Sequence, residues 1–143
     1  MSEMLATFYQ LRVLRGRCEA GAELGMDDIH TLNALERRAS KQRIDLGAVL
    51  KRGAYADGVR VSAMGPGDVL CHGCPWLEVG DVVDIAIEQA DCSYRFKARV
   101  SWCAEDEQGD FDAVLAFLGI PVMLRRGPKS RVAPPSVVER IAA

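Results

Sequence analysis

The chain has 143 residues, of which 49% are hydrophobic and 27% are charged, so we expect one domain with a sizeable core rather than a disordered chain. Eighteen basic and twenty acidic residues give a formal charge of −2, and this charge is unevenly distributed. Residues 62–120 hold eleven acidic and three basic residues, a net charge of −8, which argues against nucleic-acid binding.

No apolar run reaches the ~18–20 residues that would cross a bilayer, so no membrane span is expected. The N-terminal residues lack the basic and apolar pattern of a secretory signal, and we therefore expect a cytoplasmic protein. The five cysteines are odd in number, which argues against a disulfide framework.

Residues 1–45 are predicted to form a helical hairpin. Apolar residues recur at helical spacing, Gly21 and Gly25 interrupt the pattern, and Asp27 or Asp28 can cap a second helix. So small a hairpin is not stable alone, so its apolar face must pack on its own barrel, on a second copy or on a partner protein. The residues predicted to bind a partner are Phe8, Leu11, Leu14, Ile29, Leu32 and Leu35.

Residues 43–58 are expected to be a connector, because they contain Gly47, Gly53 and Gly58. Beyond them, apolar and polar residues alternate in short runs separated by turns rich in glycine, proline and aspartate. Short strands without helices between them favour a mainly β fold, a small antiparallel barrel. The expected strands cover residues 59–62, 69–72, 82–88, 94–102 and 111–118.

The C-terminal segment is basic and contains a proline pair that stops any sheet. Ser136 and Glu139 have the spacing of a capping box, so a short C-terminal helix is expected there. The predicted division of the chain is a hairpin extension at 1–45, a barrel at 46–122 and a basic tail at 123–143.

Cys71 and Cys74 flank His72 and raise the question of a redox pair or a zinc site. Zinc requires about four ligands, and no second ligand pair has suitable spacing. In a strand, Cys71 and His72 would also point to opposite faces. We therefore expect no metal and interpret the two cysteines as partly buried residues beside a turn, with redox or metal chemistry as an alternative.

Other polar groups are interpreted as solvated or paired. His30 is expected to be a solvated residue near the start of a helix, and the acidic stretch 105–112 a solvated loop. One row of basic residues is expected to face acidic residues of the preceding strand: Arg95, Lys97 and Arg99 opposite Asp84 and Glu88. None of the common motifs for phosphate loops, dinucleotide binding, zinc proteases or serine hydrolases is present, so we do not expect an enzyme.

The order of strands and turns resembles that of a PilZ domain over about residues 50–122. The resemblance is carried by residues 59–70, 77–83, 94–102 and 113–118. It implies a six-stranded antiparallel barrel, here with an N-terminal helical hairpin and a short C-terminal helix. PilZ domains are bacterial receptors for cyclic di-GMP and are not enzymes, so the resemblance implies a regulatory function without a cofactor.

The family binds the dinucleotide with an RxxxR stretch before the barrel and a [DN]xSxxG turn after the first strand. Arginines pair with phosphates and stack on guanine, and the turn admits close backbone donors. Aligned on this turn, the chain has Ala63, Gly65 and Asp68 at the motif positions, and no second arginine follows Arg52 at the required spacing. If the dinucleotide binds, the residues indicated are Arg52, Arg60, Gly65 and Gly67.

The sequence thus predicts a non-enzymatic bacterial regulatory adaptor that acts through protein contacts in motility or cell-surface regulation. Cyclic di-GMP binding is expected to be weak or lost. Partner binding or self-association, including homo-oligomer formation, is expected through the hairpin. The alternative is a cyclic di-GMP receptor with an atypical site.

Overall fold

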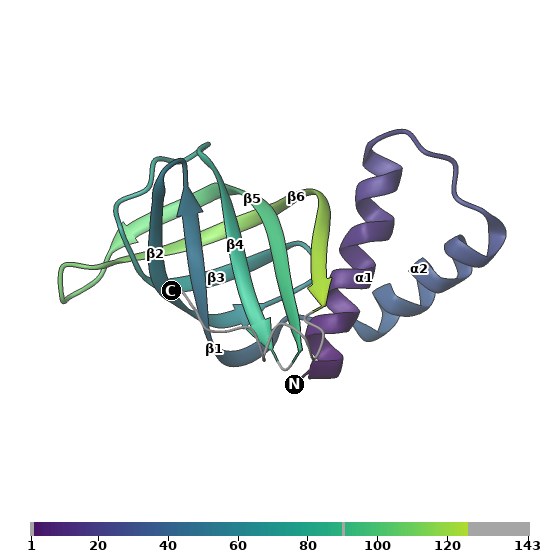
Figure 1. Ribbon diagram of the computed structural model, residues 1–143, viewed down its shortest axis with the longest axis horizontal. Helices are drawn as coiled ribbons and strands as arrows, with labels where there is room; N and C mark the ends of the chain where they lie inside the picture. Colours follow the sequence, from purple (N-terminus) through teal and green to yellow (C-terminus); the bar gives the residue numbers. More distant parts are fainter. Residues whose placement is uncertain (1, 90, 126–143) are drawn as a thin grey trace, which may run out of the picture.

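The computed structural model describes residues 2–89 and 91–125 of the chain. Within these residues, six antiparallel strands form one sheet that closes in the order β1-β2-β3-β6-β5-β4, and two helices precede the sheet (Figure 1). The mainly β fold with an N-terminal helical hairpin is therefore confirmed. The elements are α1 (Ser2–Glu19), α2 (Met26–Arg38), β1 (Gln42–Arg52), β2 (Tyr55–Met64), β3 (Asp68–Cys74), β4 (Val82–Gln89), β5 (Cys92–Glu105) and β6 (Phe111–Arg125).

The five predicted strands are all present, each longer than expected at one or both ends. The expected short C-terminal helix, and all but the first residues of the predicted basic tail, lie outside the described residues. In the part of the chain that the structure describes, neither helix is long and apolar enough to span a membrane.

The prediction of a connector at 43–58 is wrong, because this segment forms β1 and the start of β2. In β1, Ile44, Ala48 and Leu50 are buried while the residues between them are mostly exposed, which is the alternation of a half-buried strand. Gly53, with φ of 59°, lies in the tight turn that joins β1 to β2. The barrel therefore begins at Gln42, four residues before the predicted boundary.

The barrel interior is apolar and is filled by alternate residues of every strand. Tyr94, Phe96, Ala98 and Val100 of β5 point inward, as predicted, and the ring of Phe96 stacks on that of Phe117 with 4.9 Å between centroids. Trp102 was expected on the same face, but its side chain is 47% exposed. The register between β5 and β6 shifts between Val100 and Trp102, so the alternation of faces breaks there.

The helical hairpin is fastened to the barrel by its first helix. Leu5 and Phe8 of α1 belong to the same buried cluster as the barrel interior, and Tyr9 packs on Tyr94 with 5.5 Å between ring centroids. Helix α1 lies beside β6, and α2 lies on the side of α1 away from the barrel (Figure 1). Helix α2 begins after Gly25, which makes no side-chain cap, so the predicted aspartate cap is wrong.

A close backbone contact sets the distance between α1 and β6. Gly119 of β6 has φ of 61°, a conformation that favours glycine, and its carbonyl accepts a hydrogen bond from Arg12 Nε at 3.0 Å. A Cβ atom at Gly16 of α1 would overlap the Gly119 carbonyl oxygen and lie 2.7 Å from Ile120 Cγ1. Only glycine at position 16 therefore allows the helix to approach the strand this closely.

We expect the substitution Gly16→Ala to lower the free energy of unfolding by about 1–3 kcal/mol, because the added methyl group overpacks the contact between α1 and β6. Thermal and urea unfolding followed by circular dichroism measure the change. Gly47→Ala is the control, since a Cβ there meets no atom within 4 Å, and it should leave stability unchanged or slightly raised. Equal stability of the two variants would contradict the close contact.

Candidate functional site

A chain of polar side chains crosses the outer surface of three neighbouring strands. Ser62 of β2 contacts His72 of β3, with 2.5 Å between Oγ and Nε2, and His72 contacts Asp112 of β6, with 2.7 Å between Nδ1 and Oδ1. If Asp112 is ionised and His72 is neutral, the carboxylate can only accept, and Nδ1–H of His72 donates to it. Nε2 then carries the lone pair and accepts the hydrogen bond from the Ser62 hydroxyl.

The strand register places these three side chains next to one another, because Arg60 pairs with His72 and Cys71 pairs with Ala113. The register between β2 and β3 shifts between Val61 and Ala63, which makes Ser62 the extra residue of a bulge. The register between β3 and β6 shifts between Cys71 and Cys74, where Gly73 has φ of 71°. Bulges change the direction of side chains. One irregularity lies in the β2–β3 ladder and one in the β3–β6 ladder, both close to His72.

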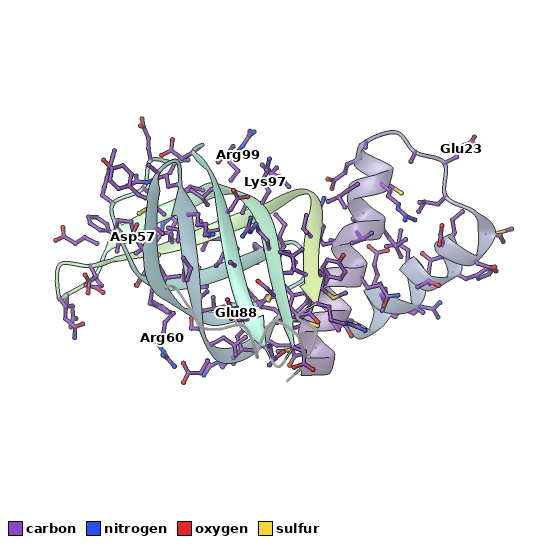
Figure 2. All side chains as sticks on the ribbon, in the orientation of Figure 1. Glu23, Asp57, Arg60, Glu88, Lys97 and Arg99 are labelled. Carbon is purple, nitrogen blue, oxygen red and sulfur yellow. The ribbon has the colours of Figure 1, made fainter. Side chains whose placement is uncertain are left out.

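A cavity of about 380 Å³ lies beside His72. Its described lining residues also include Arg60, the one arginine or lysine among them, which extends from the outer surface of the barrel (Figure 2). Arg60 is paired with Asp45 of β1, with Nε donating to Oδ1 at 2.8 Å. Both side chains are mostly exposed, so this ion pair fixes geometry more than it adds stability. The other lining residues are Gly58, Val59, Gly73, Asp106, Gln108 and Asp110.

The turn between β2 and β3 is held by backbone hydrogen bonds. Gly65 N donates to Asp68 O, and Phe117 N donates to Gly67 O, both at 2.9 Å. Lys41, which precedes β1, lies over the turn, because a Cβ at Gly65 would be 3.5 Å from the Lys41 Cα. Lys41 Nζ is 3.7 Å from Asp68 Oδ1. The turn therefore carries a paired lysine and carboxylate rather than a free cation.

The residues indicated for the dinucleotide do not form one site. Gly65 and Gly67 lie in the turn after β2, whereas Arg52 lies at the end of β1 opposite Tyr55, the first residue of β2. The ten residues of β2 place these two groups roughly 30 Å apart along the strand, at opposite ends of β2. Arg60 lies between them.

Arg52 instead joins two exposed aromatic residues at its own end of the barrel. Its guanidinium carbon lies 6.0 Å from the centroid of the Tyr55 ring, and Nη1 donates to the carbonyl of Trp76 at 3.2 Å. The Arg52 guanidinium is therefore already bound by other residues of the chain.

Most of the residues predicted to bind a partner instead pack against other residues of the same chain. Phe8 belongs to the barrel core, and Leu11, Leu14 and Leu35 form a second buried cluster between the helices, with Leu32 partly buried against it. Ile29 is 41% exposed. Apart from Ile29, the predicted contact residues thus attach the hairpin rather than offer it to a partner.

Cys71 and Cys74 are almost completely buried in the barrel interior, and both are free thiols. A hydrogen bond to Cys74, and then burial, raises the pKa of the Cys71 thiol, and the same hydrogen bond lowers the pKa of Cys74. His72 points to the opposite face, as predicted for a strand. Among the described residues, no group of three or more histidine, cysteine or acidic side chains is arranged to hold a metal ion.

The remaining predicted groups lie at the surface. His30 is exposed on α2, and the loop between β5 and β6 is closed by Asp106 Oδ1, which accepts from the backbone of Gln108 and Asp110. Lys97 lies directly opposite Asp84 in the sheet, while Glu88 lies opposite Ser93. Lys97 and Arg99 extend outward together (Figure 2).

The contact of Ser62 with His72 and Asp112 was not predicted from the sequence, in which His72 stands out only as the neighbour of two cysteines. The family's turn motif was also aligned on other residues there, with its three positions at Ala63, Gly65 and Asp68. Ser62 and Gly65 have the spacing of the last two motif positions, with Arg60 in place of the acidic or amide residue. The serine and glycine spacing was the signal that would have directed attention to Ser62.

No family model matches the chain, and no curated protein matches it. Among solved structures, the chain is similar to the inhibitor of motility MotI/DgrA of Bacillus subtilis, with 12% sequence identity and a TM-score of 0.49. The match covers 59% of this chain and 43% of that chain, so the chain spans less than half the length of that protein. A likeness of this degree does not assign a family.

We expect Cys18, which is exposed, to react with iodoacetamide in the native protein, while Cys71 and Cys74 stay unmodified until the barrel unfolds. Burial denies the reagent access to both thiols, even though the pKa of Cys74 is lowered. Peptide mapping by mass spectrometry with and without denaturant measures the labelling. Rapid native labelling of Cys74, or a stoichiometric metal in untagged protein, would contradict the structural interpretation of these cysteines.

Proposed function

We propose that the chain is a PilZ-like, non-enzymatic regulatory adaptor, which acts through protein contacts in bacterial motility or cell-surface regulation. The proposal is supported by the order of strand and turn motifs in the sequence and by the closed six-stranded barrel that follows the helical hairpin. In this proposal, cyclic di-GMP binding is weak or lost.

One observation carries the proposal: the polar groups nearest the expected ligand turn already have partners within the chain. Lys41 is paired with Asp68, Arg60 with Asp45, and Ser62 with His72. A dinucleotide would have to replace these contacts, and its phosphates would then approach the carboxylates of Asp45 and Asp68. Bringing anions together in this way disfavours binding.

A second candidate, a cyclic di-GMP receptor with an atypical site, is favoured by the position of the segment before β1. Lys41 lies over the turn that contains Gly65, and Arg37 and Arg43 flank Lys41 in the sequence. Ser62 and Gly65 also keep the spacing of the family's turn. In this candidate, ligand binding would displace Lys41 from Asp68.

Isothermal titration calorimetry with cyclic di-GMP separates the two candidates. The adaptor proposal expects no binding in the micromolar range. Asp68→Asn is the informative variant, because it releases Lys41 and removes a carboxylate from the turn, and it should raise any residual affinity for the dinucleotide. Micromolar binding by the unmodified chain, lost in Lys41→Ala, would support the receptor instead.

The outer side of α2 is the part of the hairpin left for a partner or a second copy. Met26 is 70% exposed and Ile29 is 41% exposed, and α2 packs on α1 rather than on the barrel. Exposed apolar side chains on a helix suit docking against another apolar surface.

We expect Ile29→Asp to weaken self-association without unfolding the barrel, because this side chain contributes little to the buried clusters. Light scattering coupled to size exclusion over a range of concentrations measures the association. Val79→Asp, at an exposed position on the loop before β4, is the control and should associate like the unmodified chain. A chain that is monomeric at every concentration would contradict self-association through α2.

A further inference from the structure

We propose that Ser62 is an acyl-accepting nucleophile, activated by His72 and positioned through Asp112, that takes an acyl group from small uncharged esters or thioesters. The proposal rests on the geometry of these three residues. It does not depend on the proposed adaptor function. It is also compatible with a non-enzymatic protein, because a serine that is acylated once accepts a group without catalysing turnover.

The first support is the order of contacts along the three side chains. The hydroxyl of Ser62 meets one ring nitrogen of His72, and the other ring nitrogen meets the Asp112 carboxylate. A nucleophile, a base and a group that orients the base, each within hydrogen-bond distance of the next, is the arrangement that activates a serine. Asp112 holds the tautomer in which Nε2 is free to take the proton.

The second support is the placement of the three residues in the sheet. Arg60 of β2 pairs with His72, and Ser62 follows two positions later. Cys71 pairs with Ala113 of β6, so Ser62 and Asp112 both lie next to His72 on the outer face. Ser101 of β5 also lies at a register shift, but its hydroxyl donates to the carbonyl of Val114 at 3.1 Å. A bulge alone therefore does not produce the contact with an imidazole.

The third support is access to the imidazole of His72, the neighbour of Ser62; Ser62 itself is not among the described residues that line the cavity. The side chain of His72 is 41% exposed and lines the cavity of about 380 Å³, so a small molecule can reach the ring from solvent. Asp106 and Asp110 also line the cavity, and they are opposed by one arginine that is already paired with Asp45. This surplus of carboxylates disfavours an anionic acyl donor and favours a short uncharged one.

The chemical step balances without a redox partner. Ser62 Oγ forms a bond to the acyl carbon while its proton passes to His72 Nε2, and the resulting imidazolium is stabilised by Asp112. The bond from the acyl carbon to the leaving oxygen or sulfur then breaks. The leaving group takes the proton from Nε2 and departs as an alcohol or a thiol, which leaves an O-acyl serine and a neutral His72.

The test uses the full chain with p-nitrophenyl acetate, and with an anionic succinyl ester for comparison. Released nitrophenol is followed by absorbance, and the acetylated residue is located by peptide mass spectrometry. We expect a burst close to one equivalent, acetylation of Ser62 at least tenfold faster than of Ser93 or Ser101, and slower reaction with the succinyl ester. The comparison among serines is made within one native protein and so does not depend on any variant folding.

Variants then assign the roles. Ser62→Ala and His72→Gln should abolish the burst, while Ser101→Ala should leave it unchanged. Asp112→Asn should slow acetylation about tenfold or more with the circular dichroism spectrum unchanged, and Asp112→Glu should restore part of the rate, which a purely structural carboxylate would not do.

Acetylation of Ser62 no faster than of Ser101 would overturn the proposal, as would a burst that survives in Ser62→Ala. Continued release after the burst, with acetyl-Ser62 as the trapped intermediate, would support the nucleophile and would instead overturn the non-enzymatic part of the proposed function. The calorimetric result with cyclic di-GMP is independent of each of these outcomes.

Discussion

The packing of α1 into the barrel is the contact on which the arrangement of the molecule depends. The hairpin is too short to be stable alone. Leu5 and Phe8 anchor it, because they pack in the core that the strands enclose. Close approach at Gly16 and the hydrogen bond from Arg12 to Gly119 then fix where α1 meets β6. Helix α2 is held through α1, so its outer side faces away from the barrel.

The candidate site follows from a different constraint, the closure of the sheet. Closure leaves the inside apolar, so polar chemistry is confined to the outer surface and to the turns. The pairing of β3 with β2 and with β6 places Ser62, His72 and Asp112 together there. The same surface carries the internal ion pairs that argue against a bound dinucleotide.

Local pattern was sufficient to predict most strands and the hairpin, since alternation and helical spacing are properties of neighbouring residues. Strand β1 was missed because its glycines mimic a connector, although Ile44, Ala48 and Leu50 alternate toward the core. The separation of Arg52 from Gly65 could not be predicted, because the sequence alone does not show that the whole of β2 runs between them. The contact of Ser62 with His72 and Asp112 depends on the order and register of three strands, which a single sequence does not reveal.

Strand β6 is the one element common to both regions of interest. Asp112 lies near its start, beside His72, and Gly119 lies further along, under α1. A binding event that lifted the hairpin would have to break the hydrogen bond from Arg12 to Gly119, which lies on the same strand as Asp112. The attachment of the hairpin and the serine surface therefore share one continuous strand, whose backbone sets the distance between them.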